Sequence, residues 1–128
     1  MLAAYDNPST EAFYRNLFRV FNRELGTNFH NDAYTCTVTW QLSPGGEEGL
    51  IESYFTPSSP QHIVIPPIDG QQEGVEVEIG AGEGIKVGNS VKFTRQGLET
   101  LLHRADMALC GWFTDSKGYY ALALAKKL

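Results

Sequence analysis

The sequence has no stretch of apolar residues as long as the roughly 18 that a membrane-spanning helix needs. Its first residues also lack the charged and apolar regions of a secretory signal peptide. These absences predict a cytoplasmic protein that does not enter the membrane. Basic residues are scarce too: the longest run is Lys126-Lys127 and the net charge is −5, so we expect no binding to nucleic acid or to an anionic membrane surface.

Cysteine and histidine are too few and too scattered to suggest a metal centre or a disulfide framework. Cys36 and Cys110 each lie in an alternating apolar run, where a reduced, packed thiol is the commoner state. His30, His62 and His103 show none of the short spacings that zinc ligands have. We therefore expect no metal, and a surface or capping role for each histidine.

Hydrolase and nucleotide-binding chemistry find no specific support either. No serine has the glycine context of a nucleophile elbow. The glycine-rich stretch Gly80–Gly84 lies between two predicted strands, whereas a phosphate-binding loop leads from a strand into a helix. Glu76, Glu78 and Glu83 would also repel phosphate, so a hairpin turn is the favoured interpretation.

The residues that are present describe an ordinary folded domain. Apolar residues make up 42% of the chain and charged residues 20%, which argues against disorder. A length of 128 residues fits a single domain over 1–128 with one core. The sequence alone therefore predicts a folded protein without dividing it into parts.

Two helices are predicted from capping residues and apolar spacing. Asn7 can cap a helix that begins at Pro8, and apolar residues recur at helical spacing as far as Leu25. Thr94 can cap a second helix that runs to about Ala105.

Strands are predicted where the apolar period changes to two, most clearly over residues 34–42. Together with the helices they predict an α+β fold, a mostly antiparallel sheet with two main helices packed on it. The remaining predicted strands cover residues 50–56, 63–65, 75–79, 85–93, 108–113 and 119–125.

Six short segments of the sequence, each too short to be specific alone, become informative when their order and spacing are considered together. In this order and at this spacing they resemble the C-terminal part of the histidine-specific family of S-adenosylmethionine-dependent amino-acid Nα-methyltransferases, known from the pathway to ergothioneine. The resemblance runs almost from one end of the chain to the other. The segments are Ala4-Tyr5-Asp6, Phe13-Tyr-Arg-Asn16, Asn22-Arg-Glu-Leu-Gly-Thr-Asn-Phe29, Ile51-Glu52, Ser90-Val-Lys-Phe-Thr94, and Trp112-Phe-Thr-Asp115 with Gly118 through Leu124-Ala125.

The resemblance implies a division of labour between two lobes. In that family an N-terminal Rossmann-like lobe binds S-adenosylmethionine, and the C-terminal lobe recognises the amino-acid substrate. The sequence shows no glycine-rich strand-to-helix turn followed by an acidic residue, so we expect no cofactor in this chain and S-adenosylmethionine in the complete enzyme. Methyl transfer needs the amine aligned with the sulfonium, so we expect none from this chain alone.

Four substrate-binding residues follow from the resemblance, and no catalytic residue does. Tyr5 matches a family tyrosine that helps to hold the substrate carboxylate, and Ser90 matches a serine of the substrate pocket. Two positions depart from the pattern. Where the histidine-specific enzyme has a glutamate this chain has Gly88, and where that enzyme has a methionine this chain has Ser53.

These departures bear on the substrate. Without the glutamate, an imidazole loses a charge-assisted hydrogen bond worth about 1.5 to 3 kcal/mol. Gly88 would also free volume on the strand face that it shares with Ser90. The resemblance therefore implies a substrate other than histidine, such as an aromatic amino acid or the prenylated tryptophan that fungal relatives methylate.

Three interpretations stay open at this point. The chain is a substrate-recognition lobe that works with an S-adenosylmethionine-binding lobe or subunit. Alternatively, it is a stand-alone, non-catalytic module that binds an amino-acid-like molecule on a concave face around Ser53, Gly88 and Ser90. A third possibility is a structural partner whose exposed, partly apolar surface favours a homodimer.

Overall fold

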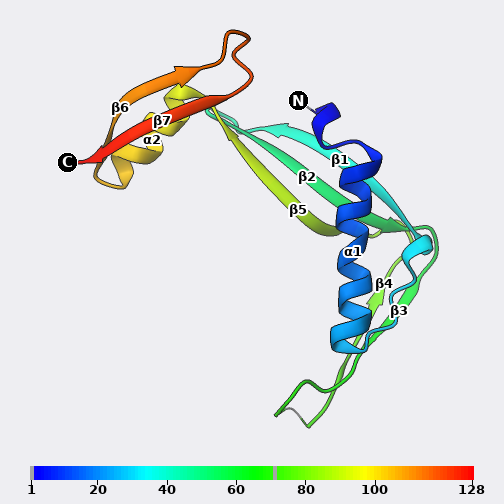
Figure 1. Cartoon of the computed structure of the whole chain (residues 1–128). Coiled ribbons are helices and arrows are strands. Elements are labelled where there is room, and N and C mark those ends of the chain that lie inside the picture. Colours follow the sequence, from blue (N-terminus) through cyan, green and yellow to red (C-terminus); the bar gives the residue numbers. More distant parts are fainter. Residues whose placement is uncertain (1, 71) are drawn as a thin grey trace. The chain divides into compact units, whose positions relative to one another are not determined.

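A computed structural model of the protein describes residues 2–70 and 72–128. These residues form an α+β structure, which confirms the predicted class, with the antiparallel strands arranged in three small sheets. In chain order the elements are η1 (Leu2–Ala4), α1 (Pro8–Leu25), η2 (Asn31–Ala33), β1 (Tyr34–Leu42), β2 (Glu48–Pro57), β3 (Gln61–Ile65), β4 (Val75–Ile79), β5 (Ile85–Phe93), α2 (Arg95–Arg104), β6 (Met107–Thr114) and β7 (Ala121–Lys127) (Figure 1).

The chain divides into two compact units. One unit comprises the residues up to Trp40 together with Ile51–Ser90, and holds α1, the β3-β4 pair and most of the three-stranded sheet β1-β2-β5. The other comprises Gln41–Leu50 and Val91–Leu128, and holds α2 with the β6-β7 pair. The sequence predicted one sheet for all strands. The structure has three sheets instead, because β3 and β4 pair with each other, as do β6 and β7, and neither pair extends the sheet β1-β2-β5. The single domain over 1–128 stays a prediction.

Helix α1 has the bounds that the sequence predicted. The Asn7 side chain accepts a hydrogen bond from the Thr10 N–H at 3.0 Å, and Pro8 takes the first helical position, where its missing N–H costs nothing. The helix ends at Gly26, whose backbone is left-handed with φ of 65°. Glycine adopts this conformation without the steric cost that a Cβ adds.

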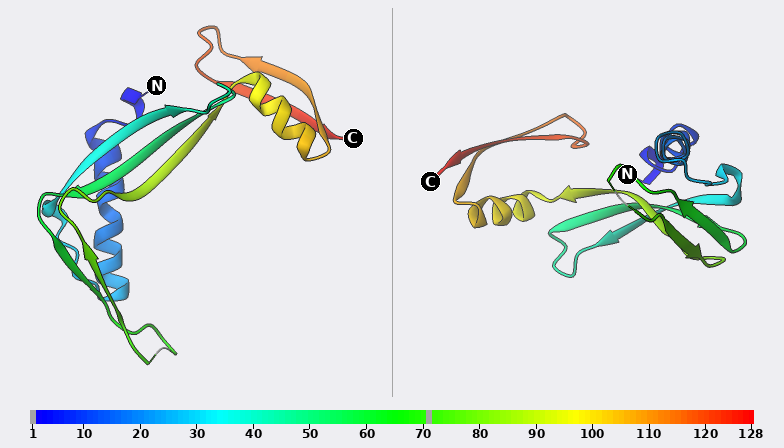
Figure 2. Two further views of the ribbon diagram at one scale, coloured as in Figure 1. Left: turned by 180° about the vertical axis from the view of Figure 1, so that it is seen from behind. Right: turned by 90° about the horizontal axis from the view of Figure 1, so that it is seen from below.

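The core of the first unit is a cluster of aromatic rings between α1 and the sheet β1-β2-β5. Phe18 of α1 stacks on Phe29 with 4.6 Å between ring centroids. Its ring also lies 4.8 Å from that of Tyr34 on β1 and 5.1 Å from that of Phe55 on β2. The views from different sides agree that α1 crosses one face of this sheet (Figures 1 and 2). The cluster therefore fixes the helix on the sheet.

The β3-β4 ribbon is joined to the end of α1 by a side chain. Asn28 donates to the His62 carbonyl at 3.0 Å and accepts from the Val64 N–H at 2.8 Å. Across the ribbon, His62 pairs with Glu78, with 2.5 Å between Nδ1 and the carboxylate. The hydrogen bond to Glu78 raises the pKa of His62 above its usual range.

In the second unit, Thr94 caps α2 as predicted, accepting from the Gly97 N–H at 3.1 Å. The pairing of β6 with β7 passes from Leu109↔Ala125 to Gly111↔Leu124, so Cys110 is the extra residue of a bulge. The bulge turns the Cys110 thiol outward, and the prediction that it is packed is wrong. Cys36 is half-buried as predicted, and both cysteines are free.

Removing the Phe18 ring should destabilise the protein far more than removing the Phe13 ring from the preceding turn of the same helix. Phe18 is 1% exposed and Phe13 is 72% exposed. Truncating a buried phenylalanine costs about 3–5 kcal/mol, whereas an exposed substitution usually stays within about 0.5 kcal/mol. Urea unfolding of Phe18→Ala and Phe13→Ala, followed by circular dichroism, measures both losses. Equal losses would contradict the aromatic core.

Candidate functional site

Two of the four predicted substrate-binding residues meet in the structure. Tyr5 follows the η1 turn, where the Leu2 carbonyl accepts from the N–H groups of Tyr5 and Asp6, both at 2.8 Å. The phenol oxygen of Tyr5 then lies 3.1 Å from Oγ of Ser90 on β5. Residues from the two ends of the first unit thus place two hydroxyl groups at one point.

A third predicted residue, Gly88, lies beneath the ring of Tyr14. A Cβ added at Gly88 would be 2.6 Å from Cε1 and Cζ of Tyr14 and closer still to its hydroxyl oxygen. The expectation of free volume at Gly88 is therefore wrong, because α1 lays an aromatic ring on it. Sequence reasoning missed Tyr14. Its available signal was the helical spacing to Phe18, which puts both rings on the buried face of α1.

Strand β5 changes its alternation at this point. Val87 packs against the aromatic core, and the next residue, Gly88, lies against Tyr14, so two neighbours in sequence face α1. Regular strands alternate their faces, so β5 departs from this alternation between Val87 and Gly88. Gly88 and Ser90, two residues apart, are half-buried and share the helix side of β5. Lys86 and Asn89 are exposed.

Ser53, the fourth predicted residue, lies in the core and not on an open surface. It is 1% exposed, between the buried side chains of Ile51 and Phe55 on β2. In this arrangement a ligand cannot reach its hydroxyl, so the concave face expected around Ser53, Gly88 and Ser90 is closed at one end. A role in substrate binding stays a prediction for all four residues.

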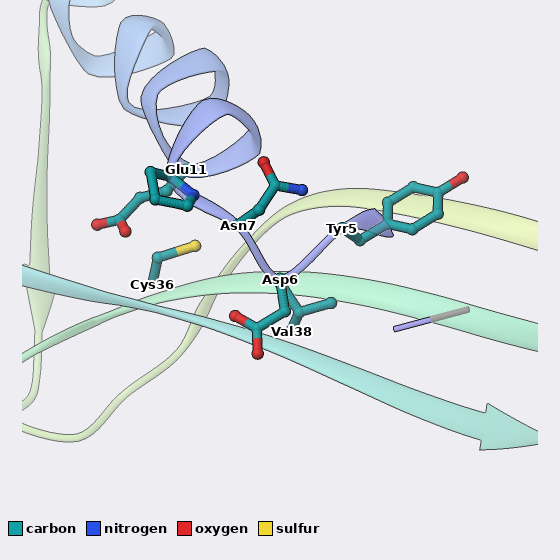
Figure 3. A pocket seen from close by; sticks show the side chains of 7 residues that line it. Tyr5, Asp6, Asn7, Glu11, Cys36 and Val38 are labelled. Carbon is teal, nitrogen blue, oxygen red and sulfur yellow. The ribbon is translucent and has the colours of Figure 1, made fainter. Parts of the chain in front are cut away.

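An open pocket of about 170 Å³ adjoins Tyr5, between the start of α1 and strand β1. The phenol of Tyr5 points away from Glu11 and Cys36 (Figure 3). The pocket and the hydroxyl pair are therefore separate features that share Tyr5. Sequence reasoning did not find this pocket, because its walls come from elements that only the fold brings together. It is lined by Tyr5, Asp6, Asn7, Pro8, Glu11, Cys36 and Val38.

The thiol in this pocket is not prepared for nucleophilic chemistry. Burial raises the pKa of Cys36 most, and the nearby carboxylates of Glu11 and Asp6 raise it further, while Arg15 lowers it. A thiol with a raised pKa stays protonated at neutral pH, and the thiolate is the reactive form. The pocket therefore offers carboxylates and a neutral thiol.

Next to Ser53, β2 carries an enclosed carboxylate. Glu52 is 5% exposed and accepts hydrogen bonds from Nζ of Lys86 at 2.5 Å and from the Tyr54 hydroxyl at 2.9 Å. The hydrogen bond from Lys86, followed by that from Tyr54, holds the pKa of Glu52 below its usual range. In turn Glu52 raises the pKa of both partners. This network joins β2 to β5.

Several kinds of site are not found among the described residues. Within residues 2–70 and 72–128, no group of three His, Cys, Asp or Glu side chains could hold a metal ion. No helix in the described part of the chain is long and apolar enough to cross a membrane. Gly80–Gly84 joins β4 to β5 through a left-handed turn at Gly82 (φ of 79°), so the turn between two strands is confirmed. It is not a hairpin turn as predicted, because β4 pairs with β3 and β5 belongs to the sheet β1-β2-β5.

Known proteins similar to this chain are methyltransferases. Residues 1–127 match the family described as "Histidine-specific methyltransferase, SAM-dependent". The histidine N-alpha-methyltransferase of Mycolicibacterium smegmatis is 32% identical over 127 residues, and that of Mycobacterium tuberculosis is 31% identical over 129 residues. These alignments cover 98% and 99% of this chain and 37% of each relative. The chain thus spans little more than a third of the length of the curated relatives that it matches.

Acidification should destabilise the protein, in part through Glu52. Its pKa is lower folded than unfolded, so its stabilising contribution is complete above the ordinary value of 4.5 and is lost as the pH falls through the lower folded value. Glu52→Gln removes this dependence and should also lower stability at neutral pH. Urea unfolding between neutral pH and about pH 3 measures it, with Glu73→Gln in an exposed loop as control. Equal acid sensitivity of both variants would contradict the assignment.

Proposed function

Because this chain belongs to the family of histidine-specific, S-adenosylmethionine-dependent methyltransferases, we propose that it forms the part that recognises the amino-acid substrate. The contact between Tyr5 and Ser90 carries this proposal. Two hydroxyl groups 3.1 Å apart can each turn toward a ligand and donate or accept a hydrogen bond. A carboxylate or an amine would find both donors and acceptors there, and hydrogen bonds to a charged group are the stronger ones.

We place the site of the methyl donor in a different lobe or subunit. S-adenosylmethionine supplies the methyl group in this family, but the glycine-rich turn of the described residues joins two strands and does not fit it. Tyr5 and Ser90 would hold the amino acid while the other part delivers the methyl group. Methyl transfer requires that the amino acid and S-adenosylmethionine are positioned against each other. Under the proposal, this polypeptide alone therefore has no methyltransferase activity.

For the substrate we propose an aromatic amino acid or a derivative of one. The similar relatives are named for histidine. In this chain Gly88 brings no side chain that could accept a hydrogen bond from an imidazole. Phenol rings lie at this part of β5 instead: that of Tyr5 reaches Ser90, and that of Tyr14 covers Gly88. An aromatic side chain gains from such rings by edge or stacking contacts.

A second candidate function is a module that dimerises or binds a protein partner. Phe113 and Leu122 are cross-strand neighbours on β6 and β7, and they are 59% and 60% exposed. Leu124 is 58% exposed and lies beside them, where the Phe113 ring covers Gly111. Exposed apolar side chains gathered on one hairpin are typical of an interface. A monomer at every concentration in sizing experiments counts against this candidate.

The chain should bind L-tryptophan or L-tyrosine more tightly than L-histidine, and do so without S-adenosylmethionine. Chemical-shift changes at the Ser90 amide during titration measure each affinity. Tyr5→Phe and Ser90→Ala should each weaken binding by about ten- to a hundredfold, because a hydrogen bond to a charged group is worth about 1.5 to 3 kcal/mol. Tyr119→Phe, at an 85% exposed position, is the matched control. Tighter binding of histidine would contradict the substrate proposal.

Incubating this polypeptide alone with labelled S-adenosylmethionine and the same amino acids should give no methylated product. The reason is that the reacting amine and the sulfonium have no common site in it. Product analysis by mass spectrometry measures the transfer. Turnover above the uncatalysed background would contradict the division of labour between two parts.

A further inference from the structure

The position of Tyr14 is set by the aromatic core and not by the loop residues around the candidate site. Tyr14 precedes Phe18 by one helical turn, so both side chains lie on the same face of α1. Tyr14 is half-buried against the core cluster that contains Phe18. The ring also makes an edge contact with Phe13, with 5.4 Å between centroids. Tyr14 therefore packs against the core and forms a wall over Gly88.

This wall stands directly beside the Tyr5–Ser90 pair. Gly88 and Ser90 are alternate residues of β5 on the helix side, which separates them by roughly 6.6 Å along the strand. The Tyr14 ring covers Gly88, and the Tyr5 phenol contacts Ser90. An amino acid whose charged groups bind at Ser90 has its side chain within reach of the Tyr14 ring.

We propose that Tyr14 determines the size of the amino-acid side chain that this site accepts. The proposal rests on the proposed function, since it presumes that the ligand binds at Tyr5 and Ser90. Gly88 alone would leave a side-chain-sized space on β5, and Tyr14 fills that space from the helix. Tyr14 and Gly88 act as a pair: a side chain at residue 88 and the ring of residue 14 exclude each other.

A double-mutant cycle tests whether the two positions share one space. Gly88→Ala should lower the melting temperature by several degrees in the wild-type background, because the added methyl meets Tyr14 atoms at 2.6 Å. In the Tyr14→Ala background the same change should cost less than half as much. Gly45→Ala, where the nearest atom is 3.6 Å away, is the control. Equal losses from Gly88→Ala in both backgrounds would overturn the pairing.

Ligand selectivity tests the functional part. In titrations of the whole chain with L-phenylalanine and L-tryptophan, Tyr14→Ala should shift the affinity ratio about tenfold toward tryptophan, the size of effect that a change of pocket volume produces. Tyr14→Phe keeps the ring and should keep the wild-type ratio, as should Tyr119→Ala at an exposed position. These variants separate pocket volume from the phenol hydroxyl and from a general effect of losing a tyrosine.

The possible failures are distinguishable. If both amino acids bind and their ratio is the same in wild type and Tyr14→Ala, the role of Tyr14 is refuted and the proposed function stands. If neither amino acid binds to any of the proteins, including wild type, the proposed function is refuted and the role of Tyr14 with it. The melting temperatures of the same variants show that each is folded when its affinity is measured.

Discussion

The contact between Phe18 and the aromatic rings of the sheet is the constraint on which the candidate site depends. It holds α1 across β1, β2 and β5, and it does so from the middle of the helix. The turn before Phe18 then carries Tyr14 onto Gly88, and the segment before the helix carries Tyr5 to Ser90. Because the helix is rigid, the contact of Tyr14 with Gly88 follows from where the Phe18 ring is packed, whereas the η1 turn before the helix also sets the place of Tyr5. The candidate site therefore depends on core packing together with this turn.

Several residues of the segments that carry the resemblance build this scaffold. Arg15 donates from α1 to the Tyr34 carbonyl at 2.8 Å and pairs with Glu11. Asn22 closes the turn after α1 through hydrogen bonds to both backbone groups of Phe29. Thr94 and Asp115 hold a helix start and a hairpin turn in the second unit. The segments that carry the resemblance therefore include much of the framework that holds the candidate site in place.

The sequence predicted local structure well and spatial neighbours poorly, for a physical reason. The bounds of α1, β1 and β5 follow from caps and apolar periods, which are properties of consecutive residues, and they were predicted to the residue. The outward turn of the Cys110 thiol comes from a bulge, and the covering of Gly88 comes from a helix far away in the chain. The alternation of apolar residues along the sequence predicts neither the bulge at Cys110 nor the covering of Gly88. The resemblance supplied Tyr5 and Ser90, which periodicity does not single out.

The relation between Gly88 and Tyr14 shows how a substitution within a family is interpreted. A glycine in place of a larger side chain suggests an enlarged pocket only while its surroundings are held constant. Here the volume left open on β5 is occupied from α1, so a loss of bulk on one element is balanced by bulk on another. What changes at such a site is the chemistry of its wall more than its volume. The resemblance implies a glutamate at the position of Gly88, and in this chain the ring of Tyr14 lies over that position. Under the proposed function, such a wall favours ligands that pack against a ring over ligands that require an acceptor.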